Sequence, residues 1–354
     1  MRTLPRVFFI KRFFLVFMLC SHFVQSAPGP KGVEDFFTVF TKEKEVILQG
    51  KEGFYLSAKP FLAELTVDRQ YLVLDNFNTR QIVVFDSTGS PFSLVGGQGK
   101  GPGEFLFPRD IAYSRTKKLL YVWDSDLKRI SVFNDVFKYV DSFRIQLNLA
   151  EIMITTDDRL FGFATNVAGA DNKVIFELSY SGDILNSFML QSVNFSPSAP
   201  SVGGGMAELE QYIYAVTPYE FYVQKFTFAG ERLNQSKDVP PQYVEPPKPV
   251  AGQLFNFNQL KEYHNSWSHI QQIMSLPQRI LVIFGEPTKI GYKKFLAILD
   301  ADTKLLQTVE IPFSFINFSC SNNRLYSFQW VAKEEMKDDN QQNGKIVCYK
   351  MKGI

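Results

Sequence analysis

A repeat of about 48 residues constrains the fold of this chain more than any other feature. Residues 71–86 read YLVLDNFNTRQIVVFD, and residues 119–135 read LLYVWDSDLKRISVFND. In each copy a short polar turn separates two apolar segments, which predicts two β-strands joined by a turn. Asp75 and Asp124 occupy matching positions and stand 49 residues apart. A period of this length indicates a repeat architecture.

The link between the two copies supplies two more strands. Residues 92–95 and 110–114 are apolar enough for strands, and the glycine-rich segment 96–107, GGQGKGPGEFLF, lies between them. Four strands per period make one blade of a β-propeller. We name the four strands of a blade A to D, from the central channel outward.

Weaker copies of the pattern follow along the chain. They begin near residues 160, 213, 281 and 325. With the two clear copies they make six units, most of them 40–50 residues apart. The sequence therefore predicts an all-β fold, a six-bladed β-propeller with four-stranded blades.

The one long gap in the repeat lies between residues 230 and 279. Residues 239–250 are dense in proline and must run extended or as polyproline II. After them, apolar residues recur at three- and four-residue spacing, namely Leu260, Tyr263, Trp267, Ile270 and Met274. This spacing suits a short amphipathic helix, although residues 270–276 equally suit the A strand of the fifth blade. We place an insertion at about residues 239–266.

Residues 33–48 precede the first complete unit and have no blade of their own. The charged run at 42–45 divides two apolar groups, which predicts two short strands and a turn. Pairing of these N-terminal strands with the last blade would cover its edge and close the ring. We therefore expect the N-terminal strands to complete the propeller.

The first 26 residues have the pattern of a secretory signal peptide. Four basic residues precede the short apolar segment 13–19, and cleavage is expected after Ser26. Residues 27–354 would then form a single propeller domain in the periplasm or outside the cell. An uncleaved membrane anchor and lipidation of Cys20 are alternatives, but lipoprotein signals have a small residue before the cysteine, where this chain has Leu19.

The charge balance argues against a nucleic-acid partner. The chain has 38 basic and 36 acidic residues, and four of the basic ones belong to the predicted signal peptide. The mature chain is therefore slightly acidic, without the clustered positive field that phosphate backbones require.

Two cysteines, Cys320 and Cys348, remain after cleavage. The repeat places Cys320 on an A strand and Cys348 on a C strand of the same blade. Two strand spacings amount to about 9.6 Å, which exceeds the roughly 7 Å limit on Cα separation for a disulfide. We therefore expect free, mostly buried thiols.

The glycine-rich segment does not match a phosphate-binding loop. In a Walker loop Ser or Thr follows the Gly-Lys pair, but Gly99 and Lys100 are followed by Gly101. The dinucleotide pattern fails as well, because Pro102 or Glu104 stands where its last glycine belongs. We interpret the segment as a turn between blades, in which Gly101 and Gly103 have structural roles.

The segments 99–108, GKGPGEFLFP, and 121–133, YVWDSDLKRISVF, resemble NHL-type repeats. The similarity is greatest to secreted bacterial six-bladed propellers with a GxGPGEF loop, and it covers about residues 64–145. In proteins of this type the fold usually implies binding and, in a minority, catalysis.

Two catalytic classes of propeller bear on the present chain. The amidating lyases that resemble it hold a metal with several histidines, whereas the mature chain has only His264 and His269, whose spacing puts them on different faces of a helix or a strand. Lactonase-like propellers use carboxylates and asparagines, and no spacing singles out such a set here. We predict no catalytic residue, no metal ligand and no cofactor, while a divalent metal in the channel stays an open alternative.

Asp75 and Asp124 end the B strands of the two clear units. Their carboxylates are positioned to accept hydrogen bonds from turn N–H groups. Arg80 and Arg129 begin the C strands and are positioned to pair with those carboxylates. Recurrence in two units favours a role in building the blades over a role in an active site.

Strand direction identifies a candidate binding face. Because strands alternate in direction, the B–C turns and the D–A links lie on the same side of the ring. Polar residues on this side are Asn78, Arg80, Lys100, Glu104, Arg109, Asp126 and Lys128. Mixed charge near a central channel suits a polar ligand or a protein partner. We expect an exported, monomeric binding or scaffold module, with a metal-dependent hydrolase or lactonase as the alternative.

Overall fold

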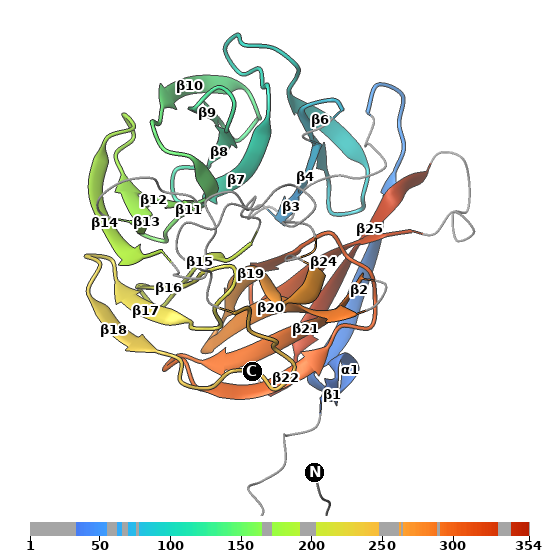
Figure 1. Ribbon diagram of the computed structural model, residues 1–354. Helices are drawn as coiled ribbons and strands as arrows, with labels where there is room; N and C mark the ends of the chain where they lie inside the picture. Colours follow the sequence, from blue (N-terminus) through green and yellow to red (C-terminus); the bar gives the residue numbers. More distant parts are fainter. Residues whose placement is uncertain are drawn as a thin grey trace, which may run out of the picture. The chain divides into compact units, whose positions relative to one another are not determined.

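The computed structural model describes residues 33–54, 62–65, 70–75, 78–164, 172–191, 203–247, 262, 265–288, 291–331 and 341–353. These residues form six sheets that surround a common axis (Figure 1). Each sheet has four antiparallel strands, and one of the sheets gains a short fifth strand that pairs parallel to its outer edge. The predicted fold, a six-bladed β-propeller with four-stranded blades, is confirmed. Among the described residues, no helix is long and apolar enough to span a bilayer.

The strands follow one another through the blades in sequence order. Blade 1 contains β3 (Leu62–Leu65), β4 (Tyr71–Asp75), β5 (Gln81–Phe85) and β6 (Pro91–Gly96). Blade 2 contains β7 (Pro108–Ser114), β8 (Leu119–Asp124), β9 (Arg129–Phe133) and β10 (Tyr139–Arg144). Blade 3 contains β11 (Leu149–Ile154), β12 (Leu160–Ala164), β13 (Lys173–Leu178) and β14 (Ile184–Leu190).

The second half of the ring is built in the same way. Blade 4 contains β15 (Gly205–Leu209), β16 (Tyr212–Val216), β17 (Gln224–Thr227) and β18 (Arg232–Gln235). Blade 5 contains β19 (His269–Leu276), β20 (Arg279–Thr288), β21 (Gly291–Asp300) and β22 (Leu305–Glu310). Blade 6 contains β23 (Phe318–Ser321), β24 (Arg324–Trp330) and β25 (Gln341–Met351).

The N-terminal segment completes the last blade. Strand β2 (Phe40–Gln49) pairs antiparallel with β25 and is the outermost strand of blade 6. The A strand of that blade, β23, contacts β3 of blade 1, so the ring closes between the last and the first blades. The predicted closure of the ring by an N-terminal strand is confirmed.

The detail of the N-terminal prediction is wrong. Instead of two strands separated by a charged turn, β1 (Glu34–Asp35) pairs parallel with β22, and one helical turn, α1 (Phe36–Val39), leads into β2. The charged run at 42–45 lies inside β2 and is exposed. The outermost strand of a blade has solvent along its free edge, so it tolerates charges that also protect that edge from association.

The apolar core of the described residues lies between the blades. Six hydrophobic clusters are present, and each joins two neighbouring blades. B and C strands contribute most, because both faces of these strands are buried, as in the fully buried β4. The many phenylalanines fill these interfaces, which explains the aromatic content without an exposed stacking surface.

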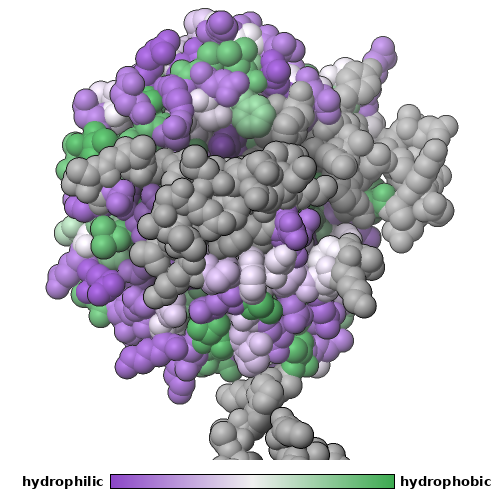
Figure 2. All heavy atoms as spheres, viewed as in Figure 1, coloured by the Kyte–Doolittle hydropathy of each residue, from purple (hydrophilic) through white to green (hydrophobic). Residues whose placement is uncertain are grey.

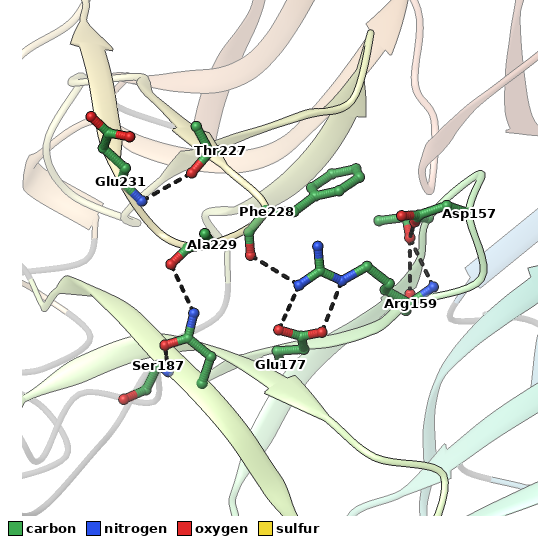
Figure 3. Close-up of polar contacts among 10 residues, drawn as sticks. Asp157, Arg159, Glu177, Ser187, Thr227, Phe228, Ala229 and Glu231 are labelled. Carbon is green, nitrogen blue, oxygen red and sulfur yellow. Dashed lines mark hydrogen bonds and ion pairs between the residues drawn. The ribbon is translucent and has the colours of Figure 1, made fainter.

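Polar contacts reinforce the interface between blades 3 and 4 (Figure 3). The Arg159 guanidinium donates to both carboxylate oxygens of Glu177 at 2.8 and 2.7 Å, and it also donates to the Phe228 carbonyl at 3.2 Å. Nearby, the Asn186 side chain donates to the Ala229 carbonyl at 2.9 Å. The bidentate ion pair lies within blade 3 and orients Arg159, while the side-chain bonds from Arg159 and Asn186 to the C–D turn of blade 4 join the two blades.

Exposed large apolar side chains lie mainly on the outer strands. Examples on β10 and β14 are Tyr139, Val140, Ile184, Leu185 and Leu190. Figure 2 shows green hydrophobic patches interrupted by purple hydrophilic side chains on the viewed face. The apolar exposure is therefore a property of the rim.

The segment predicted as an insertion begins as part of a blade interface. Tyr243 is buried and makes edge-to-face contacts with Phe221 and Phe284, with ring centroids 5.4 Å apart in both pairs. Residues 248–261, 263 and 264, which include Leu260 and Tyr263 of the predicted helix, lie outside the described residues, whereas Glu262, Asn265 and Ser266 are helical. Ile270 and Met274 lie on β19, so the strand alternative is confirmed for that part.

In the described part of the chain, Cys320 and Cys348 do not form a disulfide. Cys320 lies on β23 and Cys348 on β25, with β24 between them. This is the strand order from which the absence of a disulfide was predicted.

Candidate functional site

The two ends of the ring differ in how they are built. At the end that carries the A–B turns, hydrogen bonds join successive blades. Ser114 bonds to Asp158 between blades 2 and 3. Thr156 donates to the Glu208 carboxylate at 2.6 Å, and Ser275 donates to the Glu208 carbonyl at 2.6 Å. Blades 2 to 5 are therefore tied together at this end.

A hydrogen bond from Arg115 joins two blades that are not neighbours in the ring. Its guanidinium, on the A–B turn of blade 2, donates to the Ser321 hydroxyl of blade 6 at 2.9 Å. Because blade 1 lies between those two blades in the ring, the bond bypasses it. We call this end the tied face and the opposite end the mouth face, which carries the B–C turns and the D–A links.

Three inner strands have a β-bulge close to the mouth face. The register shifts between Pro108 and Asp110, between Leu149 and Glu151, and between Ile270 and Gln272. A bulge bends a strand locally and redirects a side chain. The residue after the bulge is polar each time, although its neighbours along the strand are largely apolar.

The three polar residues after the bulges bond to the next blade. Asp110 accepts a hydrogen bond from the Ile152 N–H at 2.6 Å, and Glu151 accepts one from the Met206 N–H. Gln272 accepts from the Phe318 N–H at 3.1 Å and donates to the Phe318 carbonyl at 2.6 Å. These residues were not predicted from the sequence, although a polar residue at one position of several A strands is a signal that an alignment of the blades could have found.

The carboxylate of Glu151 lies against the backbone of blade 4 and not in solvent. Its Oε2 lies against Gly205, where φ is +134° and a side chain would collide with that oxygen. Burial raises the pKa of Glu151 well above the ordinary value of 4.5, and the nearby charge of Asp110 raises it further, against the opposing bond from Met206. The carboxyl group therefore keeps its proton to a higher pH than an exposed glutamate.

This raised pKa predicts a pH-dependent stability. Because the folded state holds the Glu151 proton more tightly than the unfolded state, the free energy of unfolding should fall as the pH rises from about 4.5. Glu151→Gln cannot lose a proton, so its stability should decline less between pH 5 and pH 8. Urea unfolding at both pH values measures the difference, with Glu104→Gln as an exposed control. Equal pH dependence in wild type and Glu151→Gln would contradict the assignment.

Asp124 holds both the D–A link and the B–C turn of blade 2. Its buried carboxylate accepts from the Leu106 N–H at 2.7 Å and from the Phe107 N–H at 3.1 Å. It also accepts from the N–H groups of Asp126 and Leu127 at 3.0 and 2.9 Å. In blade 1, Asp75 accepts from the N–H groups of its own turn, at Asn78 and Thr79.

The predicted pairing of Arg129 with Asp124 is wrong. The Arg129 guanidinium instead donates to the carbonyls of Lys100, Gly101 and Glu104 at 3.2, 3.0 and 2.6 Å. Asp124 is saturated by backbone N–H groups, which leaves Arg129 to satisfy the carbonyls that the loop turns toward it.

The glycine-rich loop also closes on itself. The Gly101 N–H donates to the Glu104 carboxylate at 2.8 Å, and Gly103 has a φ of +75° with the Tyr139 side chain against it. The loop is thus a folded connection between blades, and Glu104 uses one carboxylate oxygen within it.

The sequence comparison of blades 1 and 2 also matched Arg80 with Arg129, and this match is wrong by one residue. Asp75 pairs with Gln81 across the turn, whereas Asp124 pairs with Arg129. The B–C turn of blade 1 is therefore one residue longer. Arg80 has a φ of 54° and corresponds to Lys128, whose φ is 49°.

The seven predicted face residues fall into three groups. Lys100 and Glu104 belong to the glycine-rich loop, and Asn78 and Arg80 belong to the B–C turn of blade 1. Among the described residues, no hydrogen bond or ion pair joins either of these groups to the third, which comprises Arg109, Asp126 and Lys128 of blade 2. That third group lies beside the bulge at Asp110.

Arg109, Asp126 and Lys128 influence one another. Burial lowers the pKa of Lys128; Asp126 opposes this effect, and Arg109 adds to it. Burial also lowers the pKa of Arg109, against the attraction of Asp110. The Lys128 ammonium lies 6.0 Å from the ring centroid of the buried Trp123. Two cations are therefore held near each other at the mouth face in a partly desolvated place.

No group of three or more His, Cys, Asp or Glu residues in the described part of the chain is arranged to hold a metal ion. His269 packs edge-to-face on Tyr292, with ring centroids 4.6 Å apart. His264 lies outside the described residues.

Comparison with known proteins places the fold. A family model described as a 6-bladed beta-propeller matches residues 64–237, which run from β3 to the end of blade 4. No curated protein matches the chain at a significant level.

Several solved structures are similar over most of their length. A Bacteroides fragilis protein that is expected to be exported is 12% identical with a TM-score of 0.66, covering 91% of this chain and 98% of that one. A member of the DUF4221 family from Bacteroides vulgatus is 13% identical with a TM-score of 0.67, covering 88% and 98%. A streptogramin B lyase is 11% identical with a TM-score of 0.50, covering 90% and 100%. At these identities the similarity establishes the fold alone.

Proposed function

We propose that this chain is an exported, monomeric propeller that binds a polar ligand or a protein partner over the mouth face. The observation that carries the proposal is the pair of partly buried cations at the mouth face, which has no counterpart among the bonds described at the tied face. At the tied face, side chains of the turns bond to neighbouring blades. At the mouth face, Arg109 and Lys128 are charged and partly buried, and neither forms an ion pair with another described residue.

Export is supported by two independent features. The first 26 residues carry a basic segment followed by a short apolar one, which is the pattern of a secretory signal. The Bacteroides fragilis protein with the same fold is itself described as a protein expected to be exported. Expression of the full chain in a bacterium, followed by mass spectrometry of the exported fraction, should give a mature protein that begins at Ala27. Full-length protein retained in the membrane would reject this part of the proposal.

Binding is tested by amide hydrogen exchange on the mature protein, residues 27–354. The probes are inorganic phosphate, succinate, glucose, putrescine and calcium chloride, at equal ionic strength. At least one probe should slow exchange in the B–C turns and D–A links and leave the A–B turns unchanged. Protection confined to the tied face, or no protection by any probe, would overturn the proposed function.

A further inference from the structure

Arg109 and Lys128 approach the same place from two different elements. Arg109 is the bulge residue of β7, between Pro108 and Asp110, and β7 is the A strand of blade 2. Lys128 is the last residue of the B–C turn, directly before β9. Pro108, Asp124 and Arg129 form one row across β7, β8 and β9, so both cations stand at the same end of the sheet.

Trp123 determines the direction of Lys128. The indole is fully buried, and its N–H donates to the Leu149 carbonyl of blade 3 at 3.0 Å. Trp123 also pairs with Asp110, the residue after the bulge at Arg109. The ammonium of Lys128 lies over this ring, 6.0 Å from its centroid, and Arg109 is near enough to act on the charge of Lys128.

The carboxylates of this region do not neutralise the two cations directly. Among the described residues, neither Arg109 nor Lys128 has a carboxylate oxygen within 4.0 Å. Asp110 accepts a backbone hydrogen bond from blade 3, and Asp126 is exposed.

Two neighbouring, partly desolvated cations without an ion-pair partner cost the folded protein free energy. The same arrangement is favourable when an anion lies between the two cations, because a charge-assisted hydrogen bond gains strength in a partly dry site. Arginine presents a planar set of donors that fits two oxygens, and lysine adds a point charge.

We propose that Arg109 and Lys128 form an anion-binding site at the mouth face, which takes a ligand bearing a carboxylate or a phosphate group. The inference rests on the proposed function and adds the chemical class of the ligand.

The test measures thermal unfolding of the mature protein at constant ionic strength, with sodium chloride replaced stepwise by inorganic phosphate or by succinate. Constant ionic strength matters because screening alone would relieve the repulsion between the two cations. With a dissociation constant of about 1 mM, 10 mM anion should raise the Tm by about 2 °C or more. Phosphate and succinate are separate arms, and the stronger effect identifies the preferred oxyanion.

Two variants locate the effect. Arg109→Gln and Lys128→Gln should each raise the dissociation constant for the anion at least tenfold, so that 10 mM anion no longer raises the Tm measurably. Without anion, each variant should be as stable as the wild type or more stable. Lys138→Gln is the matched control, because Lys138 is an exposed cation of the same blade that lies on the C–D turn, away from the mouth face. This control should respond like the wild type.

Each outcome decides a separate question. If neither phosphate nor succinate stabilises the protein, the anion site is rejected, while protection of the mouth face by glucose, putrescine or calcium would still support the proposed function. If the anions stabilise the wild type and both variants equally, binding occurs elsewhere and the assignment to Arg109 and Lys128 fails.

Discussion

Deleting residues 27–50 is expected to prevent the mature chain from folding as a stable monomer. The deletion removes β2, which pairs with β25 along nearly its whole length, and leaves blade 6 with three strands. It also removes five buried apolar side chains, namely Phe36, Val39, Phe40, Val46 and Leu48. At about 1.5–3 kcal/mol each, these contribute about 8–15 kcal/mol, which equals the usual stability of a whole domain of about 5–15 kcal/mol.

Circular dichroism during heating measures this effect. The shortened chain should show no cooperative transition near the Tm of the mature protein. A synthetic peptide of residues 33–50, added in excess, should restore part of that transition by pairing with β25. An unchanged Tm in the shortened chain would show that the ring does not depend on the N-terminal strand.

Single substitutions in β2 measure how much the packing of its buried side chains contributes to stability. Leu48→Ala removes a fully buried side chain and should cost about 2–5 kcal/mol. Thr41→Ala, at an exposed position of the same strand, should stay within about 0.5 kcal/mol of the wild type. Equal effects of the two substitutions would contradict the burial on which the prediction rests.

The second large effect is expected for Asp124→Ala. This substitution removes a buried carboxylate that accepts hydrogen bonds from four backbone N–H groups, at Leu106, Phe107, Asp126 and Leu127. Unsatisfied buried donors cost about 1–3 kcal/mol each, and water that enters the loosened turn offsets part of this. We expect a loss of about 3–5 kcal/mol, together with loosening of the glycine-rich loop.

Urea unfolding gives the free energy, and amide exchange at Leu106 and Phe107 gives the local effect. Asp126→Ala in the same turn is the control, because its side chain is exposed. Asp124→Asn retains one acceptor oxygen and should fall between the two. A loss in Asp124→Ala no larger than in Asp126→Ala would mean that the carboxylate does not hold the loop.

The architecture could be predicted from the sequence because each blade repeats the same local pattern. A buried B strand and a buried C strand, joined by a polar turn, recur with a nearly constant period, and strand pairing within a blade joins neighbours in the chain. The closure by β2 could be predicted for a related reason, since residues 33–48 had no blade and the last blade lacked a strand.

Register and side-chain partners were harder to predict. The equal spacing of Asp75 to Arg80 and of Asp124 to Arg129 hides the extra residue in the first turn, so Arg80 was matched with Arg129 although it corresponds to Lys128. A shift of one residue changes the direction of every side chain, and spacing alone does not detect it.

The sequence by itself determined the number of blades, the strand order and the face on which the D–A links and B–C turns emerge, because these follow from local periodicity. Only the tertiary structure decided which side chains meet there. The contacts of Asp110, Glu151 and Gln272 join different blades, and the approach of Lys128 to Arg109 depends on a bulge and on a left-handed turn residue. Such contacts arise when the ring closes, so they depend on distances between residues that are remote in the chain.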